Sequence, residues 1–362
     1  MSSNWPAWLR INDNIRDLTP YGAPQMSVAN RLNTNENPYA LSREVQKSII
    51  EAINEKVANL NRYPDRDAVK LRTELANFIN NRSGTSFGVE NIWAANGSNE
   101  ILQSIALAFQ GDALGFEPSY SMHPLISRAV GKKWISISRD KNFEIDSDSA
   151  VDAVLLRKPG LVFVTTPNNP TGTSMPLDSL EKIAVAAREV KALLIVDEAY
   201  AEFSSQPSAV TLIQSHPNLI VSRTMSKAFA FAGARLGYLI ADTSVIDAML
   251  LIRLPYHLSD LTQAAASAAL ANQKSLLADV VKISESRERL ISHIRDLGLE
   301  VVPSDANFIL FTGFKVSSPD LWRSLVDKGV LIRDVGIPGY LRITVGTDAE
   351  NHAFIEALRQ AL

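Results

Sequence analysis

Apolar and polar residues alternate along this chain in blocks that predict strands and helices in turn. Residues 161–164 and 193–196 are continuously apolar, which is typical of parallel strands covered on both faces. Between them, apolar residues recur at helical spacing and predict a helix over residues 178–190. A further apolar run begins at Ile220, and a short strand over residues 237–241 is predicted to close this α/β region.

After Ser244 the pattern becomes helical. Residues 263–277 are rich in alanine, and residues 283–297 carry apolar side chains in helical register, so each segment predicts a helix. Short apolar runs then predict the strands of a smaller α+β domain, over residues 308–311, 330–333 and 340–345.

These patterns divide the chain into four parts. Residues 1–35 are rich in Asn, Pro and Arg without a clear period and predict an extended arm, for which a partner subunit is one candidate surface. Residues 36–64 lead into the large domain and are also a candidate to pack with the small one. We expect a large domain over residues 65–250, with a mostly parallel sheet flanked by helices, and a small C-terminal domain over residues 251–362. The predicted fold class is α/β.

Composition narrows the classes of function. The 362 residues are 46% hydrophobic and 21% charged, which is ordinary for a globular protein, and a net charge of −3 gives no reason to expect nucleic acid or an anionic membrane as a partner. Without cysteine, disulfides and thiolate sites are excluded, and the scattered histidines predict no metal site. We expect no signal peptide and no membrane span, and therefore a cytoplasmic protein.

Polar residues follow three successive apolar runs. Asn169, Asp197 and Lys227 are spaced 28 and 30 residues apart, about one strand–helix–strand repeat. If the strands are parallel neighbours, the three side chains meet at one carboxyl edge of the sheet, where open α/β folds bind ligands. An amine, a carboxylate and an amide suit pyridoxal phosphate (PLP), because they provide a Schiff base, a partner for the pyridine nitrogen and a contact to the ring hydroxyl.

Each residue also has a simpler interpretation. Lys227 could be a solvated surface lysine, although the apolar run after it predicts desolvation and a lowered pKa. Asp197 could cap the next helix. Tyr200 follows Asp197 by about one helical turn and could reach the ring hydroxyl beside Asn169, whose bond to Pro170 is a candidate for the cis form.

A phosphate site is predicted before the apolar stretch 101–109. Gly97 removes side-chain bulk, Ser98 is a favourable N-cap, and the N–H groups of residues 98–100 would face an anion. Ser226 and Arg235 could complete this cradle. A plain capped helix remains the alternative. Tyr120 could stack on a cofactor ring or simply pack in the core. His123, near Tyr120, could line the site, but a structural role is favoured.

The order and spacing of these motifs resemble those of the PLP-dependent aminotransferases of fold type I, and among them the histidinol-phosphate aminotransferase branch. The resemblance covers nearly the whole chain. It is carried by Thr19-Pro-Tyr, Leu32-Asn-Thr-Asn-Glu-Asn-Pro-Tyr, Arg62-Tyr-Pro-Asp, Asn96-Gly-Ser-Asn-Glu, Asn168-Asn-Pro-Thr-Gly, Val196-Asp-Glu-Ala-Tyr, Ser226-Lys-Ala-Phe-Ala-Phe-Ala-Gly-Ala-Arg and Leu341-Arg-Ile-Thr-Val-Gly.

The resemblance implies a role for each of these positions. Lys227 forms the Schiff base, Asp197 pairs with the pyridine nitrogen, and Tyr200 forms a hydrogen bond with the ring hydroxyl. The implied cofactor-binding residues are Ser98, Asn99, Tyr120, Asn169, Asp197, Tyr200, Thr224, Ser226, Lys227 and Arg235, with Tyr63 reaching the phosphate from the neighbouring subunit. The implied substrate-binding residues are Tyr21, Asn35, Arg333 and Arg342. A homodimer with shared active sites follows from the role of Tyr63.

The resemblance also implies a reaction, in which imidazole-acetol phosphate and L-glutamate give L-histidinol phosphate and 2-oxoglutarate. Three alternatives remain at this stage. They are an aromatic amino-acid aminotransferase on the same scaffold, a different PLP reaction, and a PLP-fold module of a transcription regulator. The last is disfavoured because the resemblance occupies the chain and the net charge is −3.

Overall fold

The computed structural model describes residues 5–6 and 8–362, so residues 1–4 and 7 of the predicted arm lie outside the described part. A seven-stranded sheet forms the centre of the large domain, with strand order β2-β8-β7-β6-β5-β3-β4. Its strands are β2 (Ile92–Ala95), β3 (Ala113–Glu117), β4 (Trp134–Ser138), β5 (Leu161–Thr165), β6 (Leu193–Asp197), β7 (Leu219–Thr224) and β8 (Gly237–Ile240).

The sheet is mostly parallel, as predicted. Strands β4, β3, β5, β6 and β7 are parallel neighbours, whereas β8 is antiparallel to both β7 and β2. The strand predicted to close this region, β8, is its last along the chain but lies inside the sheet. The edge position belongs to β2, which comes earlier in the sequence and pairs with the outer side of β8.

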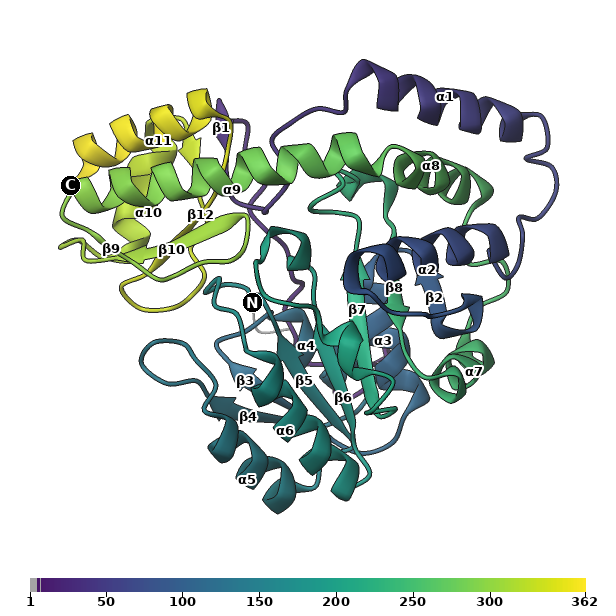
Figure 1. Ribbon diagram of the computed structural model, residues 1–362. Coiled ribbons are helices and arrows are strands. Elements are labelled where there is room, and N and C mark those ends of the chain that lie inside the picture. Colours follow the sequence, from purple (N-terminus) through teal and green to yellow (C-terminus); the bar gives the residue numbers. More distant parts are fainter. Residues whose placement is uncertain (1–4, 7) are drawn as a thin grey trace.

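Helices cover both faces, which explains the continuously apolar strands. Successive residues of a strand point to opposite sides, so Leu194 and Val196 pack in one hydrophobic cluster and Ile195 in another. The first cluster includes α2 (Val69–Ser83), α5 (Ser147–Arg157) and α6 (Leu177–Glu189). The second includes α3 (Ser98–Ala108), α4 (Met122–Ala129) and α7 (Thr243–Ile252). Figure 1 shows α5 and α6 side by side over the sheet.

The C-terminal region forms a smaller α+β unit, which lies at the yellow end of the chain in Figure 1. Its antiparallel sheet has the order β12-β10-β9, and β1 of the N-terminal arm pairs in parallel with β11. The elements are β1 (Asn30–Arg31), β9 (Glu300–Val301), β10 (Phe308–Thr312), α10 (Ser318–Asp327), β11 (Val330–Leu331), β12 (Leu341–Thr344) and α11 (Asp348–Ala361).

The helices between these units begin and end at other residues than the sequence pattern predicts. Instead of helices over residues 263–277 and 283–297, the structure has α8 (Asp260–Ala271) and α9 (Gln273–Asp296). The break lies at Asn272, whose side-chain amide donates to the Ala268 carbonyl at 2.8 Å and to the Ser48 hydroxyl at 3.0 Å. A side-chain bond of this kind competes with helix continuation. The helix that carries Ser48, α1 (Arg43–Val57), packs against α8 (Figure 1).

Short 3-10 helices complete the described chain, at Val89–Asn91, Ala201–Phe203, Ala209–Leu212 and Ala232–Ala234. Within the residues that the structure describes, no helix has the length and apolar character that a membrane crossing requires.

Candidate active site

Strands β5, β6 and β7 end at the floor of a cavity of about 490 Å³. They are parallel neighbours in register, with Thr165 opposite Asp197 and Asp197 opposite Ser222. Asn169, Asp197 and Lys227 therefore converge at one sheet edge, as their spacing predicts. The cavity wall contains every predicted site residue except Tyr63, namely Tyr21, Asn35, Ser98, Asn99, Tyr120, Asn169, Asp197, Tyr200, Thr224, Ser226, Lys227, Arg235, Arg333 and Arg342.

Asp197 is buried at the bottom of this cavity. Its Oδ2 lies 3.1 Å from Nε2 of His123, and its Oδ1 is buried without a hydrogen-bond partner in the chain. A buried carboxylate oxygen without a donor costs free energy, so this oxygen favours a ligand that brings an N–H group. A protonated ring nitrogen fits that requirement.

His123, for which the sequence favours a structural role over one in the site, lies behind the cavity and contacts Asp197. It lies on α4 with its ring edge-on to Tyr120, at a centroid separation of 5.5 Å, and it is buried. Its contact with Asp197 bridges 74 positions of the sequence, so no local pattern announces it. The contact fixes which carboxylate oxygen faces the cavity.

Lys227 has an amine suited to nucleophilic and base chemistry. Burial, together with the nearby cations Arg342 and Arg235, lowers its pKa to about 8, against the opposing effect of Glu36. The apolar neighbours in sequence correctly predict the direction of this shift, but the cationic contribution depends on the fold. The Nζ donates to the Thr34 carbonyl at 2.9 Å, which holds the amine in place.

The turn before α3 is a candidate anion site. Gly97 has φ +89° and is the N-cap of α3, so Ser98 is the first helical residue and not the cap that the sequence pattern predicts. Glycine is required there because the backbone is left-handed and a Cβ would lie 2.8 Å from Nη2 of Arg235. Arg235 Nη1 also donates to Ser226 Oγ at 3.4 Å. Free N–H groups, a hydroxyl and a guanidinium thus face one place, which suits a phosphate.

Two tyrosines border the space between the anion site and Asp197. Burial is the main reason that the pKa of Tyr120 is raised, and its hydroxyl donates to Oδ1 of Asn99 at 3.1 Å. Burial also raises the pKa of Tyr200 to about 12. Both phenols therefore keep their protons at neutral pH and serve as hydrogen-bond donors.

A second cationic group lies on the opposite wall. Arg342 is buried on β12 and donates to Oδ1 of Asn169 and, at 2.9 Å, to the Asn33 carbonyl, while its Nε has no partner. Burial lowers its pKa to about 10. Arg333 is joined to Arg342 by an antiparallel bridge, and its guanidinium lies 6.0 Å from the ring centroid of Tyr21. The two adjacent guanidinium groups favour an anionic substrate.

Residues 33–36 line the cavity, and of these the sequence analysis predicts only Asn35 as a site residue. The carbonyl groups at Asn33 and Thr34 accept from Arg342 and Lys227. Main-chain acceptors have no sequence signal, although the left-handed φ of +55° at Asn35 is a conformation that asparagine tolerates well.

Tyr63 lies outside the cavity. Its side chain is 79% exposed and stacks on Tyr256 with ring centroids 4.3 Å apart. The predicted role of Tyr63 in a neighbouring subunit's site stays a prediction. The structure also has the Asn169–Pro170 bond in the cis form.

Residues 30–358 match the family described as aminotransferase class I and II. Over 353 residues the chain is 55% identical to the histidinol-phosphate aminotransferase of Mycolicibacterium smegmatis, a match that covers 96% of this chain and 92% of that protein.

Two solved structures have similar folds. The histidinol-phosphate aminotransferase of Sinorhizobium meliloti in complex with pyridoxal-5'-phosphate has a TM-score of 0.83 at 28% identity, over 97% of both chains. A mutant of the Thermus thermophilus aspartate aminotransferase has a TM-score of 0.83 at 22% identity, over 98% of this chain and 99% of that one, and shows likeness of fold alone. These likenesses confirm the predicted fold class.

Gly237 provides a test of the anion site. A Cβ at this position would lie 2.3 Å from Ser98 N and 2.5 Å from the Gly97 carbonyl carbon, both backbone atoms. We expect Gly237→Ala to displace the turn and to weaken PLP binding at least ~10-fold, because the phosphate loses aligned N–H donors. Equilibrium dialysis measures the affinity. Gly233→Ala is the matched control, since a Cβ there meets nothing within 4 Å. Equal affinities for the two variants would contradict the assignment.

Proposed function

The chain belongs to the aminotransferase class I and II family, and we propose that it transfers an amino group from L-glutamate to imidazole-acetol phosphate, giving L-histidinol phosphate and 2-oxoglutarate. One observation carries this proposal. A lysine amine with a lowered pKa, a buried carboxylate oxygen without a partner and a pair of guanidinium groups line a single cavity. The 55% identity to a histidinol-phosphate aminotransferase supports the choice of substrate.

The cofactor is PLP, and the site residues fit it. The N–H groups at the start of α3, with Ser226 and Arg235, would hold its phosphate, and Thr224 supports this group by donating to Ser226 Oγ at 3.0 Å. The unpartnered Oδ1 of Asp197 would accept from the protonated pyridine nitrogen. Tyr200 and Asn169 would contact the ring oxygen, and Tyr120 the ring face.

When it is bound, PLP supplies an electron sink for the electron pair left at the α-carbon of the amino donor. Lys227 Nζ is suited to take the α-proton, because a pKa of about 8 leaves part of the amine neutral at neutral pH. In the second half of the cycle the same amine delivers a proton to the α-carbon of the product. The buried carboxylate of Asp197, braced by His123, would hold the protonated ring nitrogen through a hydrogen bond.

The arginine pair accounts for the use of two different substrates. Histidinol phosphate has no α-carboxylate, so its phosphate must occupy the place that receives a carboxylate of glutamate. Arg342 alone suits a carboxylate, and Arg333 adds a second cation for the more highly charged phosphate.

The aromatic aminotransferase alternative shares this fold and the Lys227 chemistry, but the identity to a histidinol-phosphate aminotransferase favours the phosphorylated substrate. We propose a cytoplasmic location as well, consistent with a chain that contains no cysteine.

Substrate preference tests the proposal directly. PLP-loaded protein is mixed with L-histidinol phosphate or with L-phenylalanine, and the visible absorption of the bound cofactor is followed in single turnovers. We expect rapid loss with histidinol phosphate and slow loss with phenylalanine. The phosphate ester can engage both arginines, whereas the α-carboxylate of phenylalanine suits Arg342 alone. The reverse order would reassign the protein to the aromatic aminotransferases.

Replacing Arg333 separates the two half-reactions. We expect Arg333→Ala to lower kcat/KM for histidinol phosphate ~10-fold or more and to lower it less for glutamate, since a charge-assisted hydrogen bond contributes about 1.5–3 kcal/mol. Arg323→Ala is the control, because Arg323 is exposed on α10 and pairs with Asp320. Equal losses for both substrates would remove Arg333 from the phosphate site.

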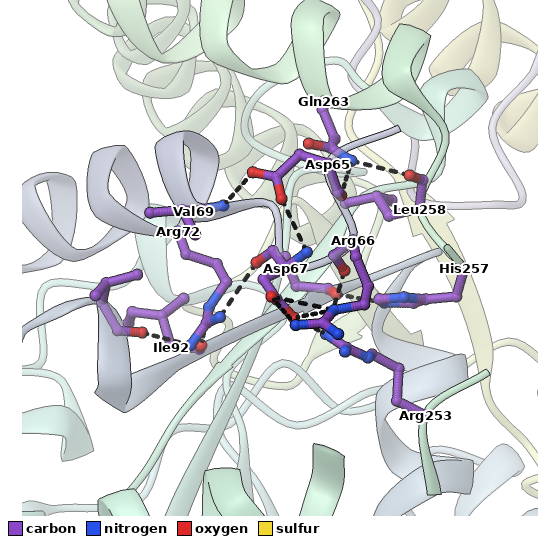
Figure 2. Close-up of polar contacts among 12 residues, drawn as sticks. Asp65, Arg66, Asp67, Val69, Arg72, Ile92, Arg253, His257, Leu258 and Gln263 are labelled. Atoms are coloured by element: carbon purple, nitrogen blue, oxygen red, sulfur yellow. Dashed lines mark hydrogen bonds and ion pairs between the residues drawn. The ribbon is translucent and has the colours of Figure 1, made fainter. Parts of the chain in front are cut away.

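We further propose a homodimer with shared active sites. Figure 2 shows how residues 65–67, which follow Tyr63 in the chain, are held. Arg253 donates to Asp67 Oδ1 at 2.9 Å and to the Arg66 carbonyl at 3.2 Å, and Gln263 donates to the Asp65 carbonyl at 3.0 Å. The hydrogen bond from Arg66, with that from Arg253, lowers the pKa of Asp67 to about 2.

Just before these residues, Tyr63 is exposed to solvent together with other apolar side chains. These side chains lie in the neighbouring stretches 57–63 and 251–256. More than half of the surface of each is exposed, and they are Val57, Leu60, Leu251 and Leu254. An exposed aromatic and apolar surface is typical of a protein interface. A second copy of the chain would cover it and would receive Tyr63 at its phosphate site.

Mixing two variants tests this arrangement. Lys227→Ala and Tyr63→Ala each impair every site of their own homodimer. In a mixed dimer with shared sites, one site combines a native Lys227 with a native Tyr63, so we expect activity to return toward about a quarter of the wild-type level. If each chain completed its own site, mixing would restore nothing. Co-purification of the two variants, each carrying a different affinity tag, confirms subunit exchange in the mixture.

A further inference from the structure

Tyr200 receives hydrogen bonds from two side-chain amides. Asn35 Nδ2 lies 2.9 Å and Asn169 Nδ2 lies 3.4 Å from its phenol oxygen, and the tyrosine is buried. An amide nitrogen only donates, so both bonds occupy lone pairs of the phenol. What remains is the O–H proton, for which no acceptor is recorded in the described part of the chain. Tyr200 can therefore act only as a donor toward the cavity.

The orientation of the Asn35 amide decides this outcome. Thr344, on β12, accepts from the Asn35 backbone N–H at 2.9 Å and donates its own proton to Asn35 Oδ1 at 3.0 Å. Thr344 is buried, so a flipped amide would leave its hydroxyl proton without an acceptor. The threonine thus turns the amide nitrogen toward Tyr200.

The Asn169 amide is oriented by the same logic. Arg342 has only donors, and its Nη1 donates to Asn169 Oδ1. The Asn169 nitrogen then faces Tyr200. Asn307 holds the backbone of this segment by donating to the Asn35 carbonyl at 3.1 Å. Of the groups involved, only Thr344 sets the Asn35 amide without itself lining the cavity.

We propose that Thr344 is a positioning residue that, through Asn35, makes Tyr200 an obligate hydrogen-bond donor to the ring oxygen of PLP. The inference rests on the proposed cofactor site but not on the identity of the amino acceptor. A hydrogen bond donated to that oxygen stabilises its negative charge. The ring oxygen then attracts the proton on the Lys227 nitrogen less strongly. The pH midpoint of the visible absorption of bound PLP is lowered as a result.

Thr344→Val keeps the shape of the side chain but removes the hydroxyl. Asn35 is then free to turn its oxygen to Tyr200, which diverts the phenol proton from the cofactor. We expect the spectrophotometric midpoint of the PLP-loaded protein to rise by about half a pH unit, roughly a threefold change in proton affinity. Thr344→Ser, which retains the hydroxyl, is the matched control and is expected to keep the wild-type midpoint.

A double-mutant cycle separates this role from a merely structural one. Tyr200→Phe is expected to raise the midpoint by itself, and adding Thr344→Val to it is expected to change nothing further, because the effect passes through the phenol. The inference is overturned if Thr344→Val leaves the midpoint unchanged, if Thr344→Ser shifts it equally, or if the shift persists in the Tyr200→Phe background.

Neutron diffraction of the deuterated wild-type protein with PLP gives a reading that does not depend on the folding of any variant. We expect a deuteron on the Tyr200 oxygen directed at the ring oxygen, and the Asn35 nitrogen facing Tyr200. The opposite amide orientation would exclude the role of Thr344. If the wild-type protein develops no visible band with PLP, the cofactor assignment itself fails. If the band forms but Thr344→Val leaves its midpoint unaltered, only the role of Thr344 fails.

Discussion

Parallel pairing of β5, β6 and β7 is the constraint on which the rest of the site depends. In register, these strands deliver the ends of three separate segments to one edge, so an amide, a carboxylate and an amine from distant positions meet without any long side-chain reach. Strand β8 then runs back through the sheet and places Gly237 against the start of α3. The anion site and the lysine are therefore fixed relative to each other by main-chain hydrogen bonds, which is the most rigid support that a fold offers.

The cavity keeps polar groups that the protein does not satisfy. Asp197 Oδ1 and Arg342 Nε are buried without partners, and Lys227 is desolvated beside two arginines. Each feature costs free energy in the folded chain unless a ligand relieves it. A ligand with complementary hydrogen-bonding groups offsets this cost, because a protonated ring nitrogen donates to Asp197 and an anion accepts from the arginines. Such a site is expected to gain stability when PLP binds, because only the folded chain presents these groups together.

Residues 33–36 connect the two parts of the molecule through the site. The segment accepts from Lys227 in the large domain and from Arg342 on β12, and its Asn35 joins Tyr200 to Thr344. Side chains from both units thus share one polar network across the cavity. A displacement of β12 relative to the large sheet would consequently alter the surroundings of the lysine amine, although no residue of β12 touches Lys227 in these hydrogen bonds.

The amino-acid sequence by itself determined the α/β class, the helix α6 and the convergence of Asn169, Asp197 and Lys227, because apolar periodicity and regular strand spacing are local properties. It also indicated Gly97 and Arg235 as parts of an anion site. Only the tertiary structure decided that His123 braces Asp197, that Asn272, at the break between α8 and α9, reaches Ser48 on α1, and that Thr344 orients Asn35. These contacts join residues or backbone groups through three-dimensional packing, and neither periodicity nor spacing along the chain encodes which partner a buried polar atom will meet.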